Sequence, residues 1–238
     1  MLLAAAVCPC PPLLVPEVAA GAAPEMDTAR AACTDALGVL AAARPELLVV
    51  VGPAGPGDGG TFPQGTRGSF KGYGVDLDVR LGAAAQAAAA ERELPSSLAV
   101  GAWLLERTGW ADAPVEGLGA EETLAPERCA GTGRELGGRA DRVALLVLGD
   151  GSACRTVKAP GYLDERAAPY DAAAARALAA ADLPALLSLD AALARALKSS
   201  GRAPWQILAG AAEGADLDGD LLYEDAPYGV GYMVATWS

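Results

Sequence analysis

Uninterrupted apolar runs predict the centre of a β-sheet. Residues 2–7, 47–51 and 143–148 consist of Leu, Val and Ala, and each run is followed within two residues by Gly or Pro. Runs of this length without polar alternation are typical of strands that helices cover on both faces. A further strand is predicted at residues 231–235, after a turn at 226–229.

Stretches with helical spacing separate these strands. Helices are predicted at residues 24–43, 96–108, 126–136, 170–199 and 205–212. Ser96 or Ser97 can cap the second helix and Gly109 can end it, whereas Leu183-Pro184 should break the fourth stretch into two helices. Strand and helix alternate, which predicts an α/β fold: one domain with a central mixed, mostly parallel sheet covered by helices.

The remaining stretches are predicted as surface segments. Residues 52–74 are rich in Gly and Pro and are predicted as a long loop, a class of segment that is often functional. Residues 75–79 alternate apolar and acidic side chains, which predicts a half-exposed strand, such as one at a sheet edge. Residues 216–220 carry three aspartates in a register that does not fit a calcium-binding loop, so an acidic turn is expected. No linker or fixed-period repeat divides the 238 residues.

Composition and charge narrow the function classes. Hydrophobic residues make up 52% of the chain and charged residues 20%, as in folded globular proteins. The net charge of −12 argues against nucleic acid and anionic membranes as partners. The chain contains no histidine, which excludes Ser-His-Asp triads, Cys-His dyads and histidine-ligated metals within it.

The number of cysteines and the length of the apolar stretches indicate the cellular compartment of the protein. Five cysteines are too few for a disulfide scaffold and an odd number leaves one unpaired, so we expect a reducing cytoplasm. Residues 1–8 lack a basic segment and are predicted as a core strand instead of a signal peptide. Residues 83–90 are too short for a membrane span.

The pair Cys8 and Cys10 directly follows the first predicted strand, at the end where α/β folds place ligands. A C-x-C pair can bind a soft metal, although zinc sites usually recruit further cysteines or histidines, and it matches a C-x-x-C redox motif poorly. Three interpretations stay open: structural thiols, a metal site and redox chemistry.

A second motif follows the third apolar run. Residues 149–152 (GDGS) could offer backbone N–H groups to an anion if a helix began immediately afterwards, or could form a tight turn that needs glycine dihedral angles. No histidine is present to act as a general base for Ser152, and Lys158 is a remote candidate for that role. The four tryptophans are expected to pack in or near the core: Trp103, Trp110, Trp205 and Trp237.

Four motifs in this order resemble one family. They are residues 4–16 (AAAVCPCPPLLVP), 45–51 (PELLVVV), 147–152 (VLGDGS) and 226–232 (APYGVGY). The chain resembles the LigB-type class III extradiol ring-cleavage dioxygenases, in particular a subunit-B-like branch. The resemblance implies a single α/β domain spanning residues 1–238 and a site that opens catechol rings with O₂ and non-haem Fe(II) held by two histidines and a third ligand.

The same resemblance assigns positions in this chain. The first ligand position falls on Cys10, the second near Ala54, the acid/base position near Arg155 and the third ligand around Gln206. Glu224 and Asp225 could supply oxygen ligands. One cleft is expected to collect these positions and their neighbours: Cys8, Cys10, Pro53, Ala54, Asp150, Gly151, Ser152, Arg155 and Gln206.

Loss of the histidines implies a lost reaction, so no Fe(II) is expected, and at most weak zinc or copper binding through Cys10. The leading hypothesis is a non-catalytic domain whose cleft serves as a binding or interaction surface for a small molecule. The alternatives are a metal- or thiol-dependent oxidoreductase rebuilt around Cys8 and Cys10, and a structural subunit of a hetero-oligomer whose partner carries the catalytic residues. Homo- or hetero-oligomerisation is left open.

Overall fold

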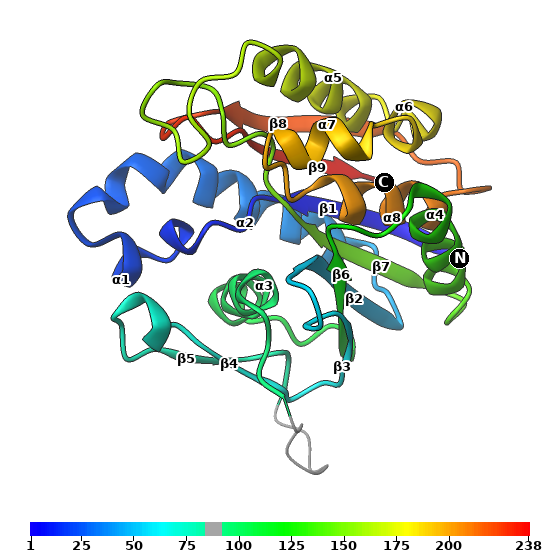
Figure 1. Ribbon diagram of the computed structural model, residues 1–238. Helices are drawn as coiled ribbons and strands as arrows, with labels where there is room; N and C mark the ends of the chain where they lie inside the picture. The colour runs from blue at the N-terminus through cyan, green and yellow to red at the C-terminus, as the bar shows by residue number, and fades with distance from the viewer. Residues whose placement is uncertain (84–91) are drawn as a thin grey trace.

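A computed structural model describes residues 1–83 and 92–238. Its strands are β1 (Leu2–Cys8), β2 (Leu47–Ala54), β3 (Gly60–Phe62), β4 (Arg67–Ser69), β5 (Asp78–Arg80), β6 (Val115–Glu121), β7 (Val143–Leu148), β8 (Gly219–Asp225) and β9 (Tyr232–Trp237). Seven of them form one sheet in the order β3-β6-β2-β7-β1-β9-β8 (Figure 1). The central strands β6, β2, β7 and β1 are parallel, whereas β3 pairs antiparallel with β6, β9 with β1, and β8 with β9.

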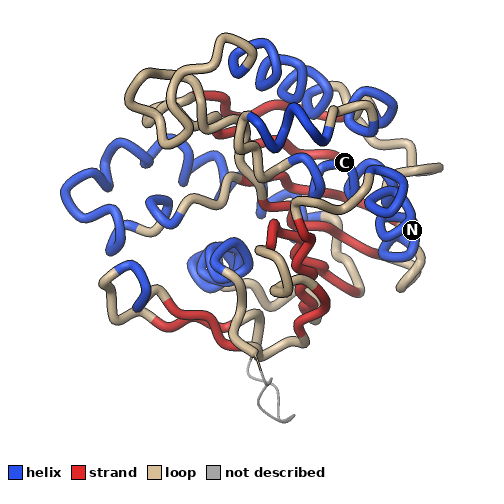
Figure 2. The backbone as a smooth tube through the Cα atoms, viewed as in Figure 1, coloured by secondary structure: helices blue, strands red, loops and turns tan. Residues whose placement is uncertain are grey.

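Helices cover both faces of this sheet (Figure 2). The α-helices are α1 (Pro16–Ala19), α2 (Asp27–Ala42), α3 (Ser96–Thr108), α4 (Pro126–Gly137), α5 (Ala167–Ala179), α6 (Leu183–Leu187), α7 (Ala191–Ala196) and α8 (Arg202–Ala211). Short 3₁₀ helices are η1 (Pro12–Leu14), η2 (Ala20–Met26) and η3 (Lys71–Tyr73). Helices α2 and α3 pack on one face, with the two-stranded β4–β5 sheet beyond α3 (Figure 1), and α4 to α8 pack on the other.

The alternation of side chains along β1 shows how the two cores arise. Ala4, Ala6 and Cys8 belong to the core beneath α2 and α3, whereas Ala5 and Val7 belong to the core beneath α4 to α8. Because successive side chains of a strand point to opposite faces, a strand covered on both faces needs apolar residues throughout. The apolar runs therefore predicted the sheet centre, and the predicted α/β class with a mixed, mostly parallel sheet is confirmed.

Several local predictions were wrong. Residues 52–74 are not one loop, because β2 continues to Ala54 and the stretch contains β3, β4 and η3. The strand predicted at 75–79 is instead β5, which begins at Asp78 and pairs with β4 outside the main sheet. The turn expected at 216–220 ends in strand β8.

Other differences concern helices and the described range. Residues 170–199 contain parts of three helices instead of two, because Asp182 and Asp190 each accept a hydrogen bond at a separate helix N-terminus. The prediction for residues 83–90 falls almost entirely outside the described residues. Within the described ranges, no helix is both long and apolar enough to cross a bilayer.

Candidate functional site

The carboxyl ends of the four parallel strands meet at one edge of the sheet, and the Cys8 and Cys10 motif lies there. Cys8 ends β1 and is fully buried, and the pKa of its thiol is raised by a hydrogen bond with Cys33 and by burial. Cys10, two residues on, is 7% exposed, and burial followed by the charges of Asp150 and Glu122 raises the pKa of its thiol well above the usual value. Both thiols are therefore protonated near neutral pH.

Cys10 lines a cavity of about 340 Å³ at the ends of β1, β2 and β6. Its wall includes two further residues of the predicted cleft, Pro53 and Ala54. The other lining residues were not predicted as site residues: Gly55, Asp58, Pro95, Ser96, Ser97 and Glu122. The structure thus brings the first two family ligand positions, Cys10 and Ala54, to one cavity.

Asp150 is hydrogen-bonded to the backbone of Cys10. Its Oδ1 accepts the backbone N–H of Cys10 at 2.8 Å, which ties the end of β7 to the end of β1. Burial raises the pKa of this carboxyl to about 7, because the Cys10 N–H only partly compensates for lost hydration. Asp150 therefore titrates in the neutral range beside the cavity.

The GDGS motif does not form an anion site. Its four backbone N–H groups are all used within the protein: Gly149 donates to the Cys8 carbonyl at 3.0 Å, and Gly151 donates to the Gly231 carbonyl at 2.7 Å. Asp150 N–H donates to Ser200 Oγ, and Ser152 N–H donates to Asp171. No helix begins directly after this motif.

The glycines of the motif serve close packing instead of turn geometry. Neither Gly149 nor Gly151 has a positive φ, which corrects the expectation of glycine dihedral angles. A Cβ at Gly149 would lie 2.4 Å from the Cα of Gly201, and one at Gly151 would lie 2.8 Å from Asp171 Oδ1. Glycine is required at both positions because the Gly201 backbone and the Asp171 carboxylate lie too close for a side chain.

Ser152 and Arg155 belong to a second cluster, centred on Asp171 of α5. Asp171 is 1% exposed and accepts three hydrogen bonds: from Ser152 N–H at 2.7 Å, from Ser152 Oγ at 2.7 Å and from Arg155 at 3.0 Å. Arg155, at the acid/base position of the resemblance, is thus held in an ion pair. No local sequence pattern indicates that Asp171 accepts these hydrogen bonds.

Gln206 is not among the residues that line the Cys10 cavity. It is fully buried in α8, where its amide nitrogen donates to the carbonyls of Leu186, Leu187 and Leu189 and its oxygen accepts from Arg202. These bonds use the side chain to join α8 to the chain around α6. Gln206 therefore has a structural role in the residues described.

Glu224 and Asp225 are not beside Cys10. They line a separate cavity of about 350 Å³ together with Arg155, Thr156 and Ala226. Of the tryptophans, Trp110 is partly buried against the core and the other three are buried within it: Trp103, Trp205 and Trp237.

These residues do not fit the Fe(II) that the family resemblance implies. Ala54 has no donor atom, Arg155 is paired with Asp171 and the Gln206 amide is fully bonded, which leaves the Cys10 thiol. Among the described residues, no group of three His, Cys, Asp or Glu side chains is placed to hold a metal ion. Non-haem Fe(II) sites need such a set with open positions for substrate.

Fold and site together define an α/β protein with a small cavity at the carboxyl ends of its parallel strands. No family model and no curated protein matches the chain. Among solved structures, the chain is similar to an uncharacterized protein of Escherichia coli K12, JW3007, with a TM-score of 0.60, 14% identity and 99% of each chain covered. This likeness shows the fold.

Proposed function

We propose that this protein is a class III extradiol dioxygenase-like domain that has lost Fe(II)-dependent ring opening and binds a small molecule in the Cys10 cavity. The observation that carries the proposal is the pairing of Cys10 and Ala54 on one cavity wall. These are the two positions that the sequence resemblance matches to iron-binding histidines, and together they offer one protonated thiol and one methyl group.

The cavity retains the properties of a binding site. It lies outside the carboxyl ends of parallel strands, where open α/β sheets place ligands. Its volume of about 340 Å³ is at the lower end of the range for small-molecule sites. The loss of Fe(II)-dependent ring opening is expected from the lack of imidazole, which removes both the nitrogen ligands and the usual proton shuttle.

The rebuilt-enzyme alternative has weaker support. A thiolate nucleophile or ligand is favoured by nearby cations, whereas Cys10 faces the carboxylates of Asp150 and Glu122, and the Cys8 thiol is buried against Cys33. Both environments favour the neutral thiol. The pair is therefore better explained as part of the core and of the cavity wall.

Anaerobic Fe(II) titration tests the proposal. The wild-type protein should bind no stoichiometric Fe(II), and Cys10→His alone should gain little because one imidazole gives too few donors. The double variant Cys10→His, Ala54→His should bind measurably more tightly, since both side chains enter one cavity. Stoichiometric Fe(II) on the wild type, or tight zinc or copper binding abolished by Cys10→Ser and not by Cys8→Ser, would contradict the proposal.

A further inference from the structure

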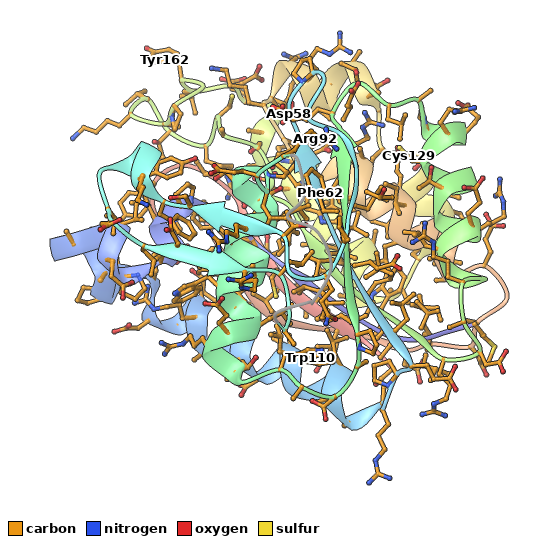
Figure 3. The ribbon with its side chains drawn as sticks, turned by 90° about the horizontal axis from the view of Figure 1, so that it is seen from below. Asp58, Phe62, Arg92, Trp110, Cys129 and Tyr162 are labelled. Atoms are coloured by element: carbon orange, nitrogen blue, oxygen red, sulfur yellow. The ribbon has the colours of Figure 1, made fainter. Side chains whose placement is uncertain are left out.

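The loop between β7 and α5, residues 149–166, presents a cluster of exposed apolar side chains. Val157 is 58% exposed, Tyr162 67% and Leu163 47%, and they make up half of the large apolar side chains that are exposed in the described part of the chain. The loop lies at the periphery of the molecule (Figure 1), and Tyr162 projects outward from it (Figure 3). We call these three residues the apolar loop patch. Exposed apolar side chains gathered in one place are typical of protein interfaces.

Backbone hydrogen bonds hold this loop in a compact shape. The Gly161 N–H donates to the Ala153 carbonyl at 2.8 Å, and the Asp164 N–H donates to the Cys154 carbonyl at 3.0 Å. The chain therefore closes on itself, and the whole apolar loop patch lies inside the closed segment. A loop with closed ends presents its side chains with little further loss of conformational entropy, which favours binding.

Tyr162 has an unusual backbone conformation. Its φ of +61° lies in the left-handed region, which a bulky residue rarely adopts and which glycine or asparagine occupies with less strain. The Tyr162 N–H donates to the Ala159 carbonyl at 2.9 Å and so completes a turn. Backbone strain of this kind persists where the surrounding structure fixes the residue, often at functional positions. The loop thus holds the tyrosine ring outside the core.

The charges beside the apolar loop patch fit a second copy of the same chain. Residues 156–166 carry two basic and two acidic side chains, whereas the whole chain has a net charge of −12. Arg166 and Asp164 pair with each other at 2.7 Å. Lys158 and Glu165 are exposed, and neither forms an ion pair within residues 1–83 and 92–238. A partner of one charge sign would meet one of these two with like charge, whereas a surface with both signs can complement itself.

We propose that the apolar loop patch is the centre of a two-fold interface between two copies of this chain. In such an interface the same residues face each other, so Tyr162 and Leu163 pack against their equivalents and Lys158 of one copy pairs with Glu165 of the other. Three apolar side chains from each copy make a small contact, which is typical of a weak, reversible dimer with a Kd of about 10–100 µM. The interface does not include the Cys10 cavity, so it goes beyond the proposed function.

Sedimentation equilibrium of the full chain at concentrations from about 5 to 300 µM tests this interface. The wild type should show a monomer–dimer equilibrium. Tyr162→Asn removes the ring and places there a residue that tolerates the left-handed backbone, and Leu163→Ser removes the second apolar side chain. Each should weaken the dimer at least about tenfold, because a few central side chains carry most of the binding energy. Tyr73→Asn, at an exposed tyrosine of η3 outside the loop, should leave the Kd unchanged.

Charge exchange tests the two-fold pairing. Lys158→Glu should weaken the dimer about fivefold, because it sets two carboxylates against each other across the interface. Adding Glu165→Lys to this variant should restore the wild-type Kd, since the pair is rebuilt with reversed polarity and the net charge returns to −12. Arg128→Glu, at an exposed arginine of α4, makes the same change in net charge away from the loop and should weaken the dimer much less than Lys158→Glu.

A wild-type protein that stays monomeric up to about 300 µM overturns the inference and leaves the patch to a different partner. A dimer that neither Tyr162→Asn nor Leu163→Ser weakens places the interface elsewhere, and this result also overturns it. Association that continues beyond two copies, or a double charge variant that stays as weak as Lys158→Glu, contradicts the two-fold arrangement. The proposed function is unaffected by each of these results, since iron binding and ring opening test it separately.

Discussion

The predicted cleft divides into two regions with opposite electrostatic character. Around Asp171, every charge is matched: the buried carboxylate accepts three hydrogen bonds from Ser152 and Arg155. Around Cys10, burial raises the pKa of the Asp150 carboxyl to about 7, and neither Asp150 nor Glu122 forms an ion pair within the described residues. The first region therefore holds a paired carboxylate, whereas the second holds carboxylates without an ion-pair partner among the described residues.

The largest expected effect is on the Asp171 region. Asp171→Ala should destabilise the protein by about 3–5 kcal/mol, because it leaves a partly buried guanidinium and the Ser152 donors without an acceptor. The free energy of unfolding from urea denaturation measures this change. Asp58→Ala, which removes an exposed carboxylate at the cavity, should cost less than about 1 kcal/mol. Equal losses for the two variants would contradict the contrast between the regions.

Asp150→Asn should raise the free energy of unfolding at alkaline pH, whereas Asp171→Ala should lower it. Because the folded-state pKa is raised from 3.8 to about 7, the stability linked to this carboxyl is fully present below about pH 4 and lost as the pH rises through about 7. Asparagine keeps an oxygen acceptor for the Cys10 N–H and carries no charge. The variant should therefore be more stable than wild type at pH 8, by about 2–4 kcal/mol, and nearly equal to it at pH 4.

The control for this prediction is the exposed residue Asp35, since Asp35→Asn should show no comparable pH-dependent gain. Denaturant titrations at both pH values give the comparison. A stability gain for Asp150→Asn that is the same at pH 4 and pH 8 would show that the carboxyl does not titrate as described.

The smallest expected effect concerns the reactivity of Cys10. Burial is the main cause of its raised pKa, and the charges of Asp150 and Glu122 add to it. Glu122→Gln should lower that pKa slightly and speed alkylation of Cys10 by iodoacetamide at pH 8.5 about two- to threefold. Peptide mass spectrometry measures the alkylation of each cysteine, and Glu127→Gln serves as the control because its carboxylate does not act on Cys10. A slower rate in Glu122→Gln would contradict the electrostatic account.

The sequence predicted those parts of the fold that local pattern determines. Residues 143–148 and 96–108 match β7 and α3, because an uninterrupted apolar run and a helix ended by glycine are local properties. Strand β6 was missed because Gly117 and Gly119 interrupt its pattern. A Cβ at Gly117 would lie 2.9 Å from the Leu81 side chain. Glycine is therefore required there by a contact with a residue that is distant in sequence.

The candidate site was predictable only in part, for the same reason. The position of Cys10, Pro53 and Ala54 follows from the strands that precede them, whereas Glu122 comes after the missed strand β6. Asp171 lies in an alanine-rich helix, where nothing local indicates that it accepts hydrogen bonds from Ser152, 19 residues away. Partners fixed by tertiary packing leave no local pattern.

Ring opening is the most direct test of the central claim that the domain is non-catalytic. Purified protein would be incubated aerobically with Fe(II), ascorbate and either catechol or protocatechuate, and the ring-opened product followed by absorbance and mass spectrometry. Product should be no higher than in the protein-free control, because the chain supplies no imidazole for metal binding or proton transfer. Product above that control, abolished by a chelator, would contradict it.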